Sequence, residues 1–244
     1  MKKWKTKSGY EIIQVLDGRC NAFIISYQKK FILVDTGRGN RWDSLRNRIE
    51  EIGCKSGVFA ALILTHTHFD HAENAARIKS KYHVPIIVNK REEAYLKCGD
   101  SPVIHGTIPI TKLATDLLAK KLQPFIKYDH VKPDILVDAN YGLDTIGLKD
   151  VYILHTPGHT MGSQSIIIDD EIAIVGDAMF GIFKWSVFPP FADDKELLIR
   201  SWENLLNTNC RIFIPAHGTE NSRNLLKKQY NKYNGGLRVC CQER

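Results

Sequence analysis

The sequence has no long apolar run near its amino terminus and no regular cysteine spacing. Residues 1–10 are basic and polar, and no segment after them could form a signal-peptide core or span a bilayer. The six cysteines are scattered without a Cys-x-x-Cys pair, which is typical of reduced thiols with structural roles. We therefore expect a soluble, cytoplasmic protein without a membrane partner.

Clustered positive charge is also missing. The formal net charge of +7 would suit an anionic substrate or a nucleic acid. The 34 Lys and Arg residues, however, are spread along the chain and not gathered in one block, which is typical of a solvated basic surface. We expect a small-molecule substrate and disfavour a nucleic-acid partner. A homodimer is compatible with the sequence.

The sequence does have the composition and the alternation of one large layered domain. Its 43% hydrophobic content is enough to fill a substantial core. Two apolar runs at 23–27 and 31–35 predict a β-hairpin, and apolar residues at helical spacing predict an amphipathic helix over 42–52. A continuous apolar run at 58–64 predicts a buried strand, followed by a helix over 72–82. Further strands and helices alternate to residue 232, which indicates a layered α/β (α+β) architecture.

Two segments do not fit this alternation. Residues 99–133 begin with a loop rich in Gly and Pro and continue as an amphipathic stretch. We interpret them as an insertion that covers an active site, with an ordinary core helix as the alternative. Residues 235–244 are expected to be a flexible tail. The prediction is a single catalytic domain over residues 1–234.

Four candidate metal ligands lie within six residues, directly after the buried strand. They are His66, His68, Asp70 and His71 in the motif Thr-His-Thr-His-Phe-Asp-His. A loop after a strand can direct several side chains to one point. Imidazoles and carboxylates are the nitrogen and oxygen donors that zinc and similar divalent ions accept. Such crowding is hard to explain by packing alone.

Three more candidate ligands each lie just beyond a predicted strand. They are His159, Asp177 and His217. Sites in open α/β sheets gather where strands end, so these segments are expected to converge with the first motif. A single histidine is more often an ordinary core or surface residue, but four such segments in order weigh against that alternative.

Together these motifs resemble the metallo-β-lactamase superfamily, from about Phe23 to His217. The resemblance implies an αββα sandwich that holds two metal ions. It implies a first metal at His66, His68 and His159, a second metal at Asp70, His71 and His217, and Asp177 as the bridge between them. It also implies that Asp35 supports the site from behind, with a turn-forming aspartate as the alternative.

The expected reaction is hydrolysis by a hydroxide that bridges two divalent ions. We expect Zn²⁺, with Fe or Mn as alternatives, and expect Asp70 to orient the hydroxide or carry a proton. The resemblance is greatest to the small lactonase and glyoxalase II-like branch, so an ester, lactone or thioester is the expected substrate. An apolar wall next to the metals is expected to bind it, with core packing as the alternative. Its candidate residues are Phe180, Phe183, Lys184 and Trp185.

Other activities of the same fold stay open. One is a persulfide-dioxygenase-like enzyme with a single iron, and another is a phosphodiesterase or nuclease. Antibiotic hydrolysis is disfavoured, because many zinc β-lactamases have Cys where this chain has Asp177. His105 and His130 lack ligand spacing and are expected to be surface or loop residues.

Overall fold

The first layer of strands is a seven-stranded mixed sheet. A computed structural model describes residues 1–122 and 126–240. The strands pair in the order β1-β2-β3-β4-β5-β6-β7, antiparallel from β1 to β4 and parallel from β4 to β7. Their bounds are β1 Lys3–Lys5, β2 Glu11–Leu16, β3 Ala22–Tyr27, β4 Lys30–Val34, β5 Val58–Ile63, β6 Ile86–Asn89 and β7 Ile135–Val137.

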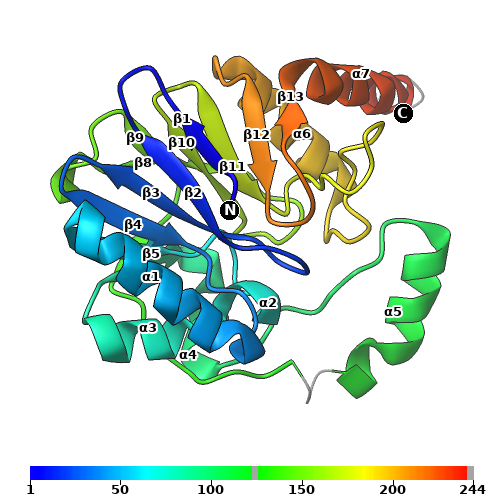
Figure 1. Cartoon of the computed structure of the whole chain (residues 1–244). Coiled ribbons are helices and arrows are strands. Elements are labelled where there is room, and N and C mark those ends of the chain that lie inside the picture. Colours follow the sequence, from blue (N-terminus) through cyan, green and yellow to red (C-terminus); the bar gives the residue numbers. More distant parts are fainter. Residues whose placement is uncertain (123–125, 241–244) are drawn as a thin grey trace.

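The second sheet has six strands and packs against the first. Its order is β13-β12-β11-β10-β9-β8, and β11 and β12 form its parallel pair. The bounds are β8 Tyr141–Gly142, β9 Val151–His155, β10 Gln164–Ile168, β11 Ile172–Gly176, β12 Ile212–Pro215 and β13 Asn221–Ser222. Figure 1 shows the two sheets side by side in the middle of the molecule.

Helices cover the outer face of each sheet. Their bounds are α1 Trp42–Ser56, α2 Phe69–Ala72, α3 Ala75–Tyr82, α4 Glu93–Cys98, α5 Pro109–Leu122, α6 Lys195–Asn207 and α7 Arg223–Cys240. In Figure 1, α1, α3 and α4 lie outside the first sheet, and α6 and α7 lie outside the second. The order of layers is therefore helix, sheet, sheet, helix, and the predicted αββα sandwich is confirmed.

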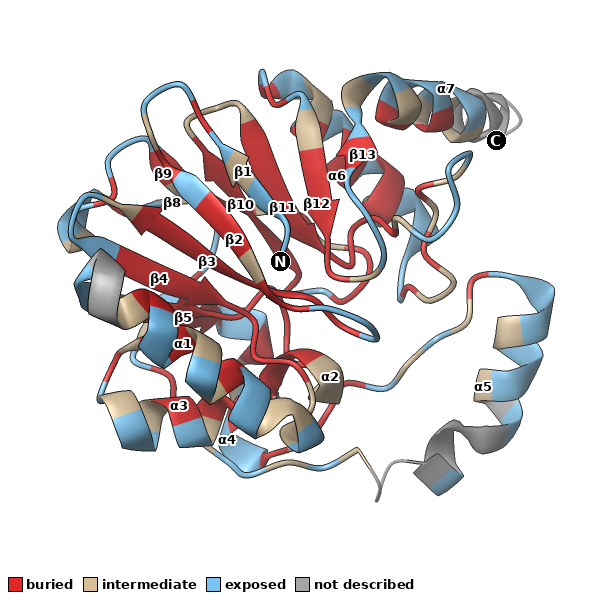
Figure 2. Ribbon diagram, viewed as in Figure 1, coloured by how far each residue is buried: buried red, intermediate tan, exposed pale blue. Residues whose placement is uncertain are grey.

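The alternating directions of the side chains along the strands explain this order of layers. In β3, Phe23 and Ile25 pack into the core between the sheets, whereas Ala22 and Ile24 pack into the core beneath the first set of helices. Successive strand residues point to opposite faces, so a strand covered on both sides must be apolar throughout. The central strands β3, β10 and β11 are accordingly buried along almost their whole length (Figure 2).

The structure adds elements that the sequence did not predict. β1 is an edge strand with Lys3 and Lys5 exposed, so it has no apolar run to indicate it, and charged residues are common on such edges. The motif after β5 was expected to be a connection between elements. Its second half forms the short helix α2, which contains Asp70 and His71.

The insertion and the carboxyl-terminal segment each contain a helix outside the two sheets. Helix α5 stands apart from the sandwich in Figure 1, and its described side chains are mostly exposed in Figure 2.

Helix α7 continues to Cys240, although a tail was expected from residue 235. Extending a formed helix is much easier than starting one, so the pair Gly235–Gly236 does not end it. Residues 241–244 lie outside the described part of the chain, in which no helix is long and apolar enough to cross a membrane.

Candidate metal centre

The seven predicted ligands come together at one edge of the sandwich, where strands of both sheets end. They are His66 and His68 after β5, Asp70 and His71 in α2, His159 after β9, Asp177 after β11, and His217 after β12. The five histidines and two aspartates are buried or nearly so. Side chains that are distant in sequence therefore share one small volume, as the strand-end argument predicts.

Three imidazole nitrogens form the first donor group. His68 Nδ1 lies 2.9 Å from His66 Nε2 and 3.0 Å from His159 Nε2. The other ring nitrogen of His159 is 2.9 Å from the Phe191 carbonyl oxygen, to which it donates, so Nε2 is free to act as a donor to a metal. Burial lowers the pKa of His66 and of His68 well below the ordinary value. Both are therefore neutral at physiological pH, which is the form that binds a divalent ion.

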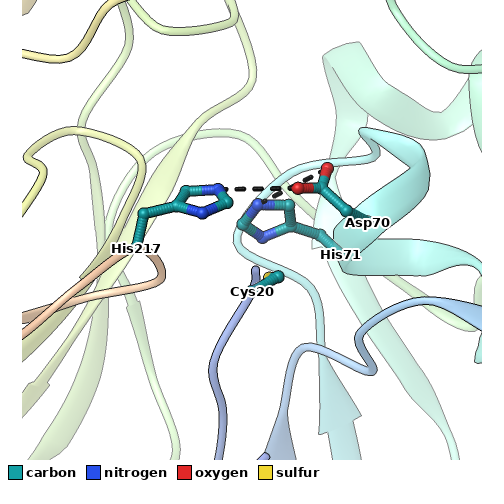
Figure 3. Close-up of side chains that lie close together, drawn as sticks. All are labelled: Cys20, Asp70, His71 and His217. Atoms are coloured by element: carbon teal, nitrogen blue, oxygen red, sulfur yellow. Dashed lines mark ion pairs between the residues drawn. The ribbon is translucent and has the colours of Figure 1, made fainter. Parts of the chain in front are cut away.

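The second donor group lies beside the first. His217 Nε2 is 3.5 Å from Asp70 Oδ2, and His71 Nε2 is 4.0 Å from Asp70 Oδ1 (Figure 3). The Cys20 sulfur belongs to the same cluster, in which one ligand atom of each residue lies within 4.8 Å of the others. His71 Nε2 is buried without a hydrogen-bond partner among the described residues. A buried unpaired nitrogen is costly unless a cation satisfies it, so the group fits a metal ion.

Asp177 lies between the two groups. Its Oδ2 is 3.4 Å from His159 Nε2 and 3.3 Å from His217 Nε2, and its Oδ1 is 3.6 Å from His71 Nε2. Burial raises the pKa of this carboxyl, but His217, His71 and His159 outweigh it and hold the pKa well below its usual range. Asp177 is thus an anion within reach of both groups, which is the place expected for a bridging ligand.

Asp35 lies behind the second group, as the resemblance implied. Its Oδ2 accepts hydrogen bonds from His71 Nδ1 at 2.9 Å and from Thr65 Oγ1 at 2.8 Å, and its Oδ1 accepts one from Thr65 N at 2.8 Å. The bond to Nδ1 fixes the ring of His71 and directs Nε2 towards the other donors. Asp35 also has a positive φ of 60°, a conformation that aspartate tolerates better than most residues.

Sequence reasoning missed Glu92, which joins two ligand-bearing loops. Its Oε2 accepts hydrogen bonds from the backbone N–H and the hydroxyl of Thr67, and its Oε1 accepts them from Thr160 Oγ1 at 2.7 Å and Gly162 N at 3.2 Å. The side chain is fully buried. Thr67 lies between His66 and His68, and Thr160 follows His159, so one carboxylate holds both sides of the first donor group. No local pattern around Glu92 indicated this role.

The four residues predicted to contact substrate separate into two kinds. Phe180 is buried and stacks on the ring of His217, with ring centroids 4.6 Å apart. Phe183, Lys184 and Trp185 are exposed, and the two aromatic rings stack on each other at 5.2 Å. Phe180 therefore supports a candidate ligand, while the loop after it presents an apolar surface to solvent.

The insertion contacts the loops of the metal centre at both of its ends. Near its start, Phe69 N donates to Ser101 Oγ at 3.3 Å, and near its end Tyr128 OH donates to the Thr67 carbonyl at 2.9 Å. His105 is 59% exposed and pairs with Asp193, and His130 is exposed. Both histidines thus lie on the surface, outside the two donor groups.

Comparison with known proteins shows the family and the fold. A sequence profile described as the metallo-beta-lactamase superfamily matches residues 15–217. A probable metallo-hydrolase of Methanocaldococcus jannaschii is 30% identical over 206 residues, which are 81% of this chain and 87% of that protein. An N-acyl homoserine lactonase of a Bacillus species is 27% identical over 169 residues, which are 67% of this chain and 56% of the lactonase.

A solved structure shows the same fold. The B3 metallo-beta-lactamase BLEG-1 has a TM-score of 0.63 at 21% identity, over 87% of this chain and 93% of that structure. A double-sheet sandwich with histidines and carboxylates gathered at one edge defines a class of proteins that bind divalent metal ions there. The chain belongs to the metallo-beta-lactamase superfamily. Its relatives named as metallo-hydrolases indicate hydrolase chemistry.

Proposed function

We propose that the chain is a dinuclear zinc hydrolase that cleaves an ester, lactone or thioester bond in a small molecule. The observation that carries the proposal is the position of Asp177, whose two oxygens lie within 3.6 Å of nitrogens from both donor groups. A carboxylate between two clusters of imidazoles suits a pair of cations better than one. Nitrogen and oxygen donors in this number also suit zinc.

The candidate metal ligands have distinct roles in this proposal. Two divalent ions bound there would supply a water that ionises near neutral pH and a Lewis acid for the scissile carbonyl. His66, His68 and His159 would hold the first ion with neutral nitrogens, and the second ion would lie among Asp70, His71 and His217. Asp177 would neutralise part of the charge of both.

Asp70 is the residue proposed to handle the proton. Its side chain is 19% exposed, compared with 4% for Asp177, so it is the more open of the two carboxylates. It lies beside His217, with its Oδ2 3.5 Å from His217 Nε2. A carboxylate in this place can orient the attacking water and accept its proton.

The exposed aromatic pair suggests the kind of substrate. Phe183 and Trp185 are 54% and 71% exposed, although large apolar side chains are normally kept from water. Stacked rings on a loop that begins next to Asp177 suit the apolar part of a small ester or lactone. Lys184 between them would attract a carboxylate of the substrate. The similarity to an N-acyl homoserine lactonase supports this class of bond.

Metal analysis followed by a substrate panel tests the proposal. The purified protein should contain about two zinc ions per chain and hydrolyse a lactone, an aryl ester or a glutathione thioester faster than a phosphodiester or a β-lactam. The variant His217→Ala should lose turnover and about one ion. The matched control His130→Ala alters an exposed histidine and should keep both.

The other outcomes identify the competing activities. One iron per chain, with oxygen consumed in the presence of a persulfide, would replace the proposal with the dioxygenase alternative. Preferential cleavage of the phosphodiester would support the phosphodiesterase alternative. A protein that binds no divalent ion would overturn the proposal.

A further inference from the structure

We propose that Cys20 is a sulfur ligand of the second metal ion. The inference rests on the proposed pair of metal ions, and it adds a thiolate to the donors Asp70, His71 and His217. Cys20 was expected to be a structural thiol, because the six cysteines are scattered without a Cys-x-x-Cys pair. The structure instead places its sulfur in the same cluster as these three side chains (Figure 3).

The loop that contains Cys20 is fixed to the segment that contains His217. The neighbouring Asn21 donates from its backbone N–H to the Ala216 carbonyl at 2.7 Å, and from Nδ2 to the carbonyls of Pro215 and Gly218, each at 3.1 Å. Gln14 Nε2 donates to Asn21 Oδ1 at 2.8 Å. These hydrogen bonds all involve Asn21, which directly follows Cys20, and they hold the sulfur next to His217.

The distances suit a common ion. One ligand atom each from Cys20, Asp70, His71 and His217 lies within 4.8 Å of the other three. In tetrahedral coordination, zinc–sulfur bonds of about 2.3 Å and zinc–nitrogen bonds of about 2.0–2.1 Å place the sulfur and a nitrogen of one ion about 3.6 Å apart. Side-chain adjustments of about 1 Å would bring the donors to that distance. The buried Nε2 of His71 makes no hydrogen bond with the described residues and has only longer contacts, 3.6 Å to Asp177 Oδ1 and 4.0 Å to Asp70 Oδ1, so an ion among these donors would give it a close partner.

The surroundings of Cys20 differ from those of a structural cysteine in the same protein. Cys210 is buried and packs within the apolar core beneath α6 and α7. Cys20 is also buried, at 5% exposure, yet it belongs to none of the three apolar clusters. Its sulfur donates a long hydrogen bond of 3.6 Å to the Asn21 carbonyl and also interacts with the side chain of His71. A thiol among imidazoles and a carboxylate has the surroundings of a ligand.

Binding would release one proton. The sulfur donates a lone pair to the ion and the thiol hydrogen leaves to solvent, with no change in oxidation state. A thiolate is a softer donor than nitrogen or oxygen, so the second position should prefer zinc or cobalt over manganese. The first position, with three imidazoles and Asp177, should show less of this preference.

Metal spectroscopy of cysteine variants tests the inference. The protein loaded with cobalt(II) should show a thiolate-to-cobalt charge-transfer band in the near ultraviolet, and X-ray absorption of the zinc protein should show a sulfur neighbour at about 2.3 Å. Cys20→Ser should abolish both signals and weaken binding of the second zinc ion by about tenfold or more. Cys98→Ser, at an exposed cysteine, and Cys210→Ser, at a core cysteine, should keep both signals.

A reciprocal variant keeps the test decisive if Cys20→Ser does not fold. Replacing the other five cysteines with alanine leaves Cys20 alone, and the sulfur neighbour should remain. Two bound ions without a sulfur neighbour, or a charge-transfer band that persists in Cys20→Ser, would overturn this inference and leave the proposed function intact. Failure to bind any ion would instead overturn the proposed function.

Discussion

The orientation of His71 depends on a single buried carboxylate. Asp35 accepts hydrogen bonds from His71 Nδ1 and from both donors of Thr65. Asp35→Asn removes the charge and places an amide against at least one N–H or O–H donor. We expect unfolding to become easier by about 1–3 kcal/mol and the affinity for the second ion to fall about 10–100-fold.

Chemical denaturation and zinc competition titration measure the two effects of Asp35→Asn. The control is Asp129→Asn, at an exposed aspartate, which should change neither quantity. Unaltered zinc affinity in Asp35→Asn would mean that the carboxylate does not orient His71.

Asp70 offers a different prediction, because it is a candidate ligand with a proposed chemical role. Asp70→Ala should lose turnover and most of the second ion, while the first ion stays bound to three imidazoles that the change does not touch. Metal content and hydrolysis rate, measured on the same sample, check this. Near-normal turnover in Asp70→Ala would refute the role in proton transfer.

Single residues also show what sequence could and could not predict about the site. The ligands near residue 66 were predictable because imidazoles and carboxylates crowd within six positions, and packing does not require such crowding. Glu92 was not predictable, since its partners Thr67 and Thr160 are 25 and 68 positions away. In the sequence, Cys20 is one of six scattered cysteines. In the structure, the hydrogen bonds of Asn21 place the Cys20 sulfur beside His217. Contacts made by the fold have no local sequence pattern.

At the scale of elements, Glu92 joins the connection after β5 to the connection after β9. It ends the short helical turn Lys90–Glu92 and accepts four hydrogen bonds from the two connections. Glu92→Gln places an amide against donors that need an acceptor. The two connections should therefore separate, and unfolding should become easier by about 1–3 kcal/mol. The first ion, held by residues from both connections, should bind more weakly.

Hydrogen exchange and zinc titration of Glu92→Gln measure this effect. Faster exchange at the Thr67 and Gly162 amides would locate the change in the two connections. The adjacent Glu93→Gln is a matched control, because Glu93 forms a surface pair with Lys97, which is worth only about 0.3–0.5 kcal/mol. Equal effects of the two variants would contradict the proposed role of Glu92.

The burial of its side chains decides whether a strand can be predicted from the sequence. Strands covered on both faces, such as β5, appear as continuous apolar runs and were predicted. The edge strand β1 has alternating exposed lysines and was missed, since its pairing with β2 provides the order that its side chains do not indicate. Helix α5 was anticipated as an amphipathic stretch, but its exposed Leu113 and Leu117 show that the described part of its apolar face is turned to solvent.

For the whole molecule, the metal centre lies where the two sheets meet, and its donors come from both. β5 and α2 belong to the first half, and β9, β11 and β12 belong to the second. Metal ions bound at this centre would link the two halves. Three apolar cores, one between the sheets and one beneath each set of helices, hold the layers together independently of any ion. Removing the metal should therefore destabilise the protein without unfolding it.

Thermal unfolding with and without zinc tests this division of roles. Free zinc at about 100 times its dissociation constant adds about 2.7 kcal/mol to the folded state for each site, which for a protein of this size raises the unfolding temperature by roughly 5–10 °C per site. The chelated protein should keep its far-ultraviolet circular dichroism at 25 °C and lose that increase. His217→Ala removes a metal donor that follows β12 of the second sheet, so zinc should raise its unfolding temperature by less. His130→Ala should show the full rise. Loss of secondary structure on chelation would mean that the ions, and not the three cores, hold the sandwich together.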